Sequence, residues 1–246
     1  MIKFLAAAAF AATIATAASA GTYVAVDFDR NADLFPLTDG WLPFTPTPGT
    51  DMTGNQGSSI PFDIVGDGND VWSSTVGDYA GTKTLNVTTD LFGVDKIYTL
   101  INTFWGSSIT GLTSITFNAT NSVSQTFELT GGVEIRDFAS TSFSNTTTSP
   151  NTSLWHENDS GYSVARLDMQ VFDLEDAFLS ETLTSIVLED KGLHYQAFGQ
   201  YAHRAFVAGI TAEITPAVPL PGAAMLFLGA LGSLGAVRNR RTRHKA

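Results

Sequence analysis

The sequence predicts an all-β protein, built as an antiparallel two-sheet sandwich with a jelly-roll-like arrangement. Apolar and polar residues alternate with period two in short runs, and clusters of Gly, Asn, Asp, Ser and Thr separate these runs. Helical periodicity is nearly absent. Because each short strand has one apolar face, the strands must bury those faces against a second sheet. Residues 21–216 are therefore expected to form one β-sandwich domain.

Most strands of the first half of the domain are short, and two of them show the alternation most clearly. Residues 113–119 place Ile115, Phe117 and Ala119 on one face and polar side chains on the other. Residues 124–130 place aromatic and aliphatic side chains together in the same way. In chain order, the expected strands of this half are residues 23–28, 60–65, 84–88, 96–104, 113–119, 124–130 and 133–138.

The second half of the domain contains three further expected strands, residues 166–171, 183–189 and 206–214. In the last of them, the even-numbered residues from Phe206 to Ile214 are expected to face the core together. Residues 174–181 are the stretch that could form a short helix or turn.

The composition excludes several classes of function. The 246 residues contain no Cys, so disulfides, thiolate metal sites, iron–sulfur clusters and cysteine nucleophiles are not available. The formal net charge is −11, and six of the 13 basic residues lie within about 20 to 30 residues of the two chain ends. The central domain keeps seven basic residues against all 24 acidic ones, a net charge near −17. Such a surface argues against a nucleic-acid partner and favours divalent cations.

Residues 1–20 have the composition of a secretory signal peptide. A single Lys3 precedes an apolar run, and the segment closes with the small residues Ala18, Ser19 and Ala20. We expect signal peptidase to cleave after Ala20.

Residues 217–246 have the composition of a membrane-spanning tail. Val218, Pro219, Leu220 and Pro221 precede an almost wholly apolar stretch, residues 222–237, which is followed by four Arg and one Lys. Counted from residue 217, the stretch has the length of a helix that crosses the hydrocarbon core. The basic residues would stay in the cytoplasm, so the domain would lie outside the inner membrane.

This tail resembles the PEP-CTERM sorting signal of Gram-negative bacteria, in which a short Pro motif, an apolar helix and an Arg-rich terminus follow one another. The Val218-Pro219-Leu220-Pro221 motif is similar to the VPLPA-type variant, with Gly222 in place of the usual Ala. The resemblance implies processing by an exosortase-type membrane protease, transfer to the cell envelope or surface, and association with exopolysaccharide. A plain single-span anchor would give the same topology and keep the tail.

A Gly-punctuated acidic loop is a candidate Ca²⁺ site. Asp63, Asp67, Asn69 and Asp70 could supply several of the six to eight oxygen ligands that Ca²⁺ takes. The spacing is not that of an EF-hand, and an ordinary solvated turn would have the same composition.

Tryptophans beside loop-like segments are candidates for carbohydrate binding. Trp155, Trp105, Trp72 and Trp41 each lie near polar residues, and a flat aromatic ring next to such residues suits a ring-shaped polar ligand. Trp155 is expected to be the most exposed of them. Packing in the core is the alternative for each.

No catalytic residues can be named from the sequence. The mature chain has three His residues and none lies in a spaced catalytic signature. Arg136 with Asp137, and Arg166 with Asp168, are expected to be charge pairs within a sheet. The leading interpretation is an exported, non-enzymatic β-sandwich that interacts with polysaccharide or matrix. A secreted carbohydrate-active hydrolase and a structural surface protein with no small ligand remain open.

Overall fold

The computed structural model describes residues 21–32, 51–64, 69–76, 81–139, 146–159, 164–195 and 200–215. Within these ranges the regular structure consists of fourteen β-strands and two short 3₁₀-helices, with no α-helix, which confirms the all-β prediction. No helix of the described part is long and apolar enough to cross a bilayer. The predicted signal peptide with its Ala20 site, and the predicted tail with its motif Val218, Pro219, Leu220 and Pro221, lie outside the described residues.

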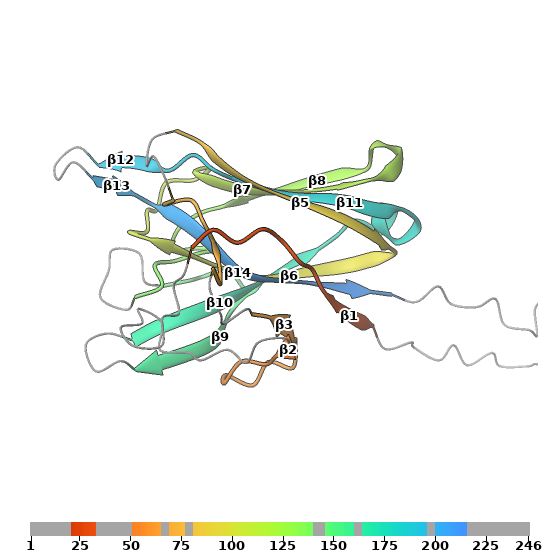
Figure 1. The fold of residues 1–246 in the computed structure, drawn as a ribbon, viewed down its shortest axis with the longest axis horizontal. Coiled ribbons are helices and arrows are strands. Elements are labelled where there is room, and N and C mark those ends of the chain that lie inside the picture. The colour runs from red at the N-terminus through yellow and green to blue at the C-terminus, as the bar shows by residue number, and fades with distance from the viewer. Residues whose placement is uncertain are drawn as a thin grey trace, which may run out of the picture. The chain divides into compact units, whose positions relative to one another are not determined.

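The strands form two main antiparallel sheets (Figure 1). The second sheet has the order β5-β11-β7-β8, and the first has the order β1-β14-β6-β10-β9, with β4 also pairing with β14. The chain crosses between the two sheets from β5 to β6, from β6 to β7, from β8 to β9 and from β10 to β11, whereas β7 with β8 and β9 with β10 are neighbours within one sheet. The first sheet contains β1 (Thr22–Ala25), β4 (Trp72–Ser73), β6 (Val94–Phe104), β9 (Thr152–Asp159), β10 (Val164–Asp173) and β14 (Arg204–Ile214). The second contains β5 (Lys83–Phe92), β7 (Thr113–Ala119), β8 (Ser124–Leu129) and β11 (Thr182–Asp190).

Smaller elements complete the fold. The 3₁₀-helix η2 lies where the sequence predicts a short helix or turn. Two small two-stranded sheets join β2 to β3 and β12 to β13. These elements are β2 (Asp51–Met52), β3 (Phe62–Asp63), β12 (Leu193–Tyr195), β13 (Gln200–Ala202), η1 (Thr120–Ser122) and η2 (Asp176–Ser180).

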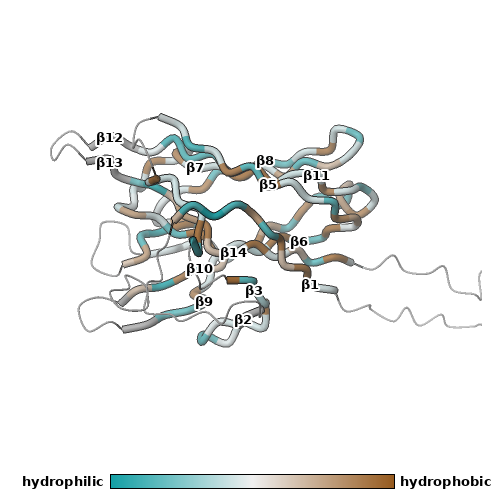
Figure 2. Tube along the Cα trace, viewed as in Figure 1, coloured by the Kyte–Doolittle hydropathy of each residue, from teal (hydrophilic) through white to brown (hydrophobic). Residues whose placement is uncertain are grey.

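The first sheet is buried on both faces. One core cluster fills the space between the sheets, and it includes Phe117, Ile97 and Ile186. A second cluster lies on the other face of the first sheet, where Phe62 of β3 packs with Leu100 and other residues of that face. The β2–β3 hairpin and the residues around it therefore form a cover over the outer face. In Figure 2, hydrophobic stretches of the first sheet run through the middle of this arrangement.

Strand β14 differs from its prediction because it contains a β-bulge. The register shifts between Val207 and Gly209, so Phe206 packs under the cover whereas Ile210 packs between the sheets. The expectation that the even-numbered residues share one face is therefore wrong across the bulge. A Cβ at position 209 would lie 2.9 Å from the Phe62 ring, so glycine lets the cover approach this backbone closely.

The expected strand 133–138 is also wrong. Residues 131–139 form turns with isolated bridges, because the Thr130 carbonyl accepts hydrogen bonds from the backbone N–H groups of Val133, Glu134 and Ile135. The end of this segment instead bridges two strands of the first sheet. Asp137 pairs with Thr103 of β6, and Ala139 pairs with Ala165 of β10.

Candidate functional site

Of the three tryptophans on which the structure reports, only Trp105 is exposed. Trp105 is 49% exposed. Trp72 is 6% exposed and lies in the core between the sheets. The predicted exposure of Trp155 is wrong, because it is fully buried at 0%. Its ring packs edge-to-face against Phe62 at 5.4 Å, and its Nε1 donates to the carbonyl of Ile60 at 3.4 Å. Trp41 lies outside the described residues.

Trp155 was misjudged because strand β9 does not look like a strand in the sequence. Thr152 and Ser153 precede Leu154 and Trp155, and mostly polar residues follow them, which is typical of a loop. The cover turns this edge of the first sheet into an interior position, and Gly54 makes that possible. A Cβ on Gly54 would lie 1.9 Å from the Trp155 carbonyl oxygen.

Two of the proposed Ca²⁺ ligands, Asp63 and Asn69, form hydrogen bonds with Arg30. The Asp63 carbonyl accepts a hydrogen bond from Nη2 of Arg30 at 3.0 Å, and Asn69 donates to the Arg30 carbonyl at 3.4 Å. Asp70 is buried, and Asp67 lies outside the described residues. No group of three or more His, Asp or Glu side chains that could hold a metal occurs in the described ranges. The Ca²⁺ site stays a prediction, and a guanidinium close to it would oppose a bound cation.

Trp105 follows directly on β6 and has an unusual backbone conformation. Its φ is 54°, and His203, which precedes β14, has a φ of 57°. Both lie in the left-handed region, which costs a non-glycine residue about 1–3 kcal/mol. The two residues hold each other, because the His203 N–H donates to the Trp105 carbonyl at 2.7 Å. Strained backbone conformations cluster at active sites, ligand clamps and switch regions.

The His203 ring fixes the segment that follows Trp105. The N–H of Ser107 donates to Nδ1 at 3.3 Å, and Nε2 lies 2.9 Å from Oγ1 of Thr113. Because Nδ1 accepts a hydrogen bond, these contacts assign the proton of the neutral ring to Nε2, which donates to Thr113. His203 is fully buried, and burial lowers its pKa. The nearby Asp190 raises this pKa and Arg204 lowers it, both by smaller amounts.

This environment predicts an acid-sensitive contribution to stability. The unfolded chain binds a proton at His203 near pH 6.5, and the folded protein binds it only at lower pH. The contribution is therefore fully present above pH 6.5 and is lost as the pH falls below that value, with a slope of at most about 1.4 kcal/mol per pH unit. Urea unfolding at a series of pH values between 7.5 and 5 should show a steeper loss for the natural protein than for His203→Asn.

Asn is the matched control because it tolerates the left-handed conformation and does not titrate. His156, whose pKa is also lowered by burial, is present in both proteins and cancels from the comparison. Equal slopes for the two proteins would show that His203 does not titrate in this window.

Next to His203 in the sequence, Arg204 belongs to a buried charged cluster that joins the two sheets. Asp190, the last residue of β11, accepts hydrogen bonds from the N–H of Ala205 at 2.8 Å and of Gly192 at 2.8 Å. The Ser74 hydroxyl also donates to it. Nη1 of Arg204 lies 3.8 Å from its carboxylate. This cluster could not be predicted from the sequence, because no periodic pattern marks a buried polar residue whose partners come largely from other strands and loops.

A serine, a histidine and an aspartate thus lie at this end of the sandwich, but their contacts are not those of a nucleophile and its base. Ser74 donates directly to Asp190, whereas His203 contacts Ser107 and Thr113. All three members are buried. In a catalytic triad the serine hydroxyl is hydrogen-bonded to the histidine, and the serine is accessible to substrate.

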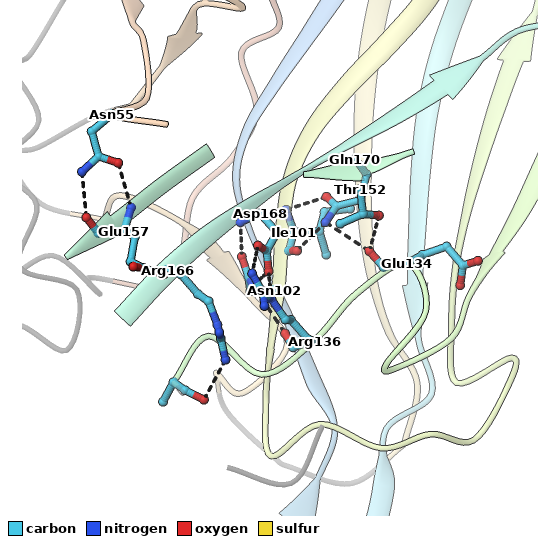
Figure 3. Close-up of polar contacts among 11 residues, drawn as sticks. Asn55, Ile101, Asn102, Glu134, Arg136, Thr152, Glu157, Arg166, Asp168 and Gln170 are labelled. Atoms are coloured by element: carbon cyan, nitrogen blue, oxygen red, sulfur yellow. Dashed lines mark hydrogen bonds and ion pairs between the residues drawn. The ribbon is translucent and has the colours of Figure 1, made fainter. Parts of the chain in front are cut away.

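A second polar cluster lies where β6 and β10 separate (Figure 3). Their backbone pairing runs from Lys96 to Leu100 on β6, and beyond it side chains connect the strands. The Gln170 amide accepts from the Ile101 N–H at 3.0 Å and donates to the Ile101 carbonyl at 2.9 Å. Asn102 also connects the two strands, since its Oδ1 accepts from the Asp168 N–H at 2.9 Å.

Arg136 also binds where β6 and β10 separate. Its Nε and Nη2 donate to the two oxygens of Asp168 at 2.7 and 2.6 Å, and Asn102 donates to the same carboxylate at 2.8 Å. The Asp168 side chain is 0% exposed. Arg166, the expected partner of Asp168, donates instead to the carbonyl of Ala139 at 3.4 Å. Because every charged group here faces a partner inside the protein, the cluster supports the fold rather than a ligand.

No protein-family model, curated protein or solved structure matches this chain.

Proposed function

We propose that this chain is an exported, non-enzymatic β-sandwich protein of the cell envelope or surface, and that it binds extracellular polysaccharide through Trp105. The observation that carries the proposal is the exposed indole of Trp105 on a backbone that is held in a strained conformation by the buried His203. A side chain on a backbone that is already held in place loses less conformational entropy on binding than one on a mobile loop. It offers a flat apolar face to the ring of a sugar.

The proposed class of fold is a jelly roll. The strand orders β1-β14-β6-β10 and β5-β11-β7-β8, with several crossings of the chain between the two sheets, support this class. The proposed processing takes the chain across the inner membrane, with cleavage by signal peptidase after Ala20 and by an exosortase-type protease near the Pro motif.

The position of Trp105 is compatible with the proposed membrane-anchored form. Trp105 contacts the residue before β14, and the other end of β14 leads to the sorting segment. Eleven residues of strand separate these two ends by about 33 Å. Trp105 therefore lies at the end of β14 opposite to the one from which the chain continues toward the predicted tail.

The negative net charge of the domain favours neutral polysaccharides over anionic ones as ligands. The domain has seven basic residues and 24 acidic ones. Its net negative charge repels an anionic polymer unless a divalent cation bridges the protein and the polymer. All four arginines of the domain already bond to other parts of the protein. We therefore expect neutral sugars to bind without added cations and acidic ones to require them.

Trp105→Ala tests the proposal on a glycan array. Loss of a central aromatic contact costs about 2 kcal/mol, so the dissociation constant of a bound glycan should rise about 30-fold. Trp105→Phe keeps a ring and should retain most of the affinity. Phe92→Ala removes an exposed ring at the opposite end of the sandwich and should leave binding unchanged.

Three results would contradict the proposal. Binding that survives Trp105→Ala would place the ligand elsewhere, and turnover of a bound glycan would favour the hydrolase. A natural protein that binds no glycan would favour a structural surface protein. The intact mass of the same preparation reports whether both proposed cleavages have occurred.

A further inference from the structure

The end of the sandwich opposite Trp105 carries a second exposed apolar surface. Phe92, the last residue of β5, is 56% exposed, and Leu179 of η2 is 38% exposed. The two belong to adjacent segments, because the Leu179 carbonyl lies 3.6 Å from the position of a Cβ on Gly93. We call Phe92 and Leu179 the apolar end surface. Two large apolar side chains are thus exposed on neighbouring segments at one end of the sandwich.

The chain leaves the domain at this surface. The N–H of Thr215, the last described residue, donates to the Gly93 carbonyl at 3.1 Å, and the Gly93 N–H donates to the Glu181 carbonyl at 3.2 Å. Strand β1 begins at the same end, since Thr22 pairs with Ile214. Figure 1 shows β1 starting and β14 finishing on the same side, away from β12 and β13.

The length of the connecting chain limits how far the surface can lie from the apolar tail. Six residues, 216–221, separate Thr215 from the apolar stretch 222–237. A fully extended chain of this length spans at most about 25 Å. A bilayer that takes up the apolar stretch would thus lie within about 25 Å of the apolar end surface.

We propose that the apolar end surface rests on the lipid bilayer while the tail is inserted. This inference depends on the proposed function, because it needs the membrane-anchored form. A second copy of the chain fits less well, since a stable dimer buries about 1,200–2,000 Å² and two part-exposed side chains offer far less. A bilayer contact needs little intrinsic affinity, because the tether raises the effective concentration to the millimolar range.

The charges around the surface predict which lipids it prefers. Glu181 is exposed beside Gly93, where Thr120 and Asn121 donate to its carboxylate, and Asp176 begins η2. No lysine or arginine belongs to η1 or η2. We expect contact with zwitterionic lipid and weaker contact as the fraction of anionic lipid rises.

Spin labels can test the contact on the full chain, because the natural sequence has no cysteine. Ser180→Cys places a nitroxide beside Leu179 and keeps both apolar residues. Ser108→Cys is the matched control at the Trp105 end, where the side chain is also exposed. Leu228→Cys reports on the tail. The measurement is the accessibility of each label to oxygen, which concentrates in lipid, relative to an aqueous nickel complex, in vesicles of phosphatidylcholine.

The expected oxygen-to-nickel ratio is several-fold higher for the Ser180 label than for the Ser108 label. It should fall to the Ser108 value when Phe92→Ser and Leu179→Ser are added, and it should decrease as anionic lipid is mixed in. The inference is overturned if the Ser180 and Ser108 labels agree while the Leu228 label lies in lipid. It is also overturned if Ser180 labels broaden one another, which would indicate a dimer. A Leu228 label in water would instead refute the membrane-anchored form itself.

Discussion

Replacing Trp155 with alanine is expected to lower the free energy of unfolding by about 3–5 kcal/mol, the range for large aromatic residues in a core. Trp155 is fully buried, contacts Phe62 of the cover, and donates a hydrogen bond to the Ile60 carbonyl. Its loss would leave a cavity between β9 and the cover, together with an unsatisfied carbonyl. Urea unfolding followed by far-ultraviolet circular dichroism measures the change.

Trp105→Ala is the matched control for Trp155→Ala, because it removes the same side chain from an exposed position. We expect it to change stability by less than about 0.5 kcal/mol, as is usual at exposed positions. Two equal losses would contradict the buried position of Trp155. Hydrogen exchange should further show that Trp155→Ala exposes the cover first, because that residue joins the cover to the first sheet.

Asp168→Ala is expected to cost a similar amount, about 3–5 kcal/mol, because it leaves the Arg136 guanidinium buried without its carboxylate. The two groups share two hydrogen bonds of 2.7 and 2.6 Å, and the Arg136 side chain is only 13% exposed. Denaturant titration at neutral pH gives the difference. Asp173→Ala breaks the exposed pair with Lys96 and should change stability far less, because water screens that pair.

A double variant separates the pair from its surroundings. Arg136→Met with Asp168→Leu removes both charges and should recover most of the stability that Asp168→Ala loses, since an apolar pair can replace a buried ion pair. A double variant as unstable as Asp168→Ala would indicate that Asn102, which also donates to Asp168, accounts for the loss.

The sequence predicts the sheets well where one face of a strand is polar. Strands β5, β7, β8 and β11 lie within or around the segments expected from alternation, because each of them has one outward face. The prediction is poorer in the first sheet. Its central strands pack against the second sheet on one side and against the cover on the other. Both faces of these strands are therefore apolar, and apolar and polar residues do not alternate along them.

The candidate site was predictable only in part. Trp105 is named among the tryptophans from its polar neighbours, but the same reasoning selects Trp155, which the cover buries. His203 and Asp190 belong to different strands or loops, and Ser74 lies more than 100 residues before them. Their contacts depend on the strand order, which local periodicity does not specify.

The double burial of β14 also limits how the protein can change over generations. In β5, Thr84 and Asn86 face outward, whereas Leu85 and Val87 face inward, so every second position is free to drift. Nine successive residues of β14, from Arg204 to Ala212, are buried. The sequence of this strand should therefore be conserved at every position among homologues, and more strongly than the sequences of the loops.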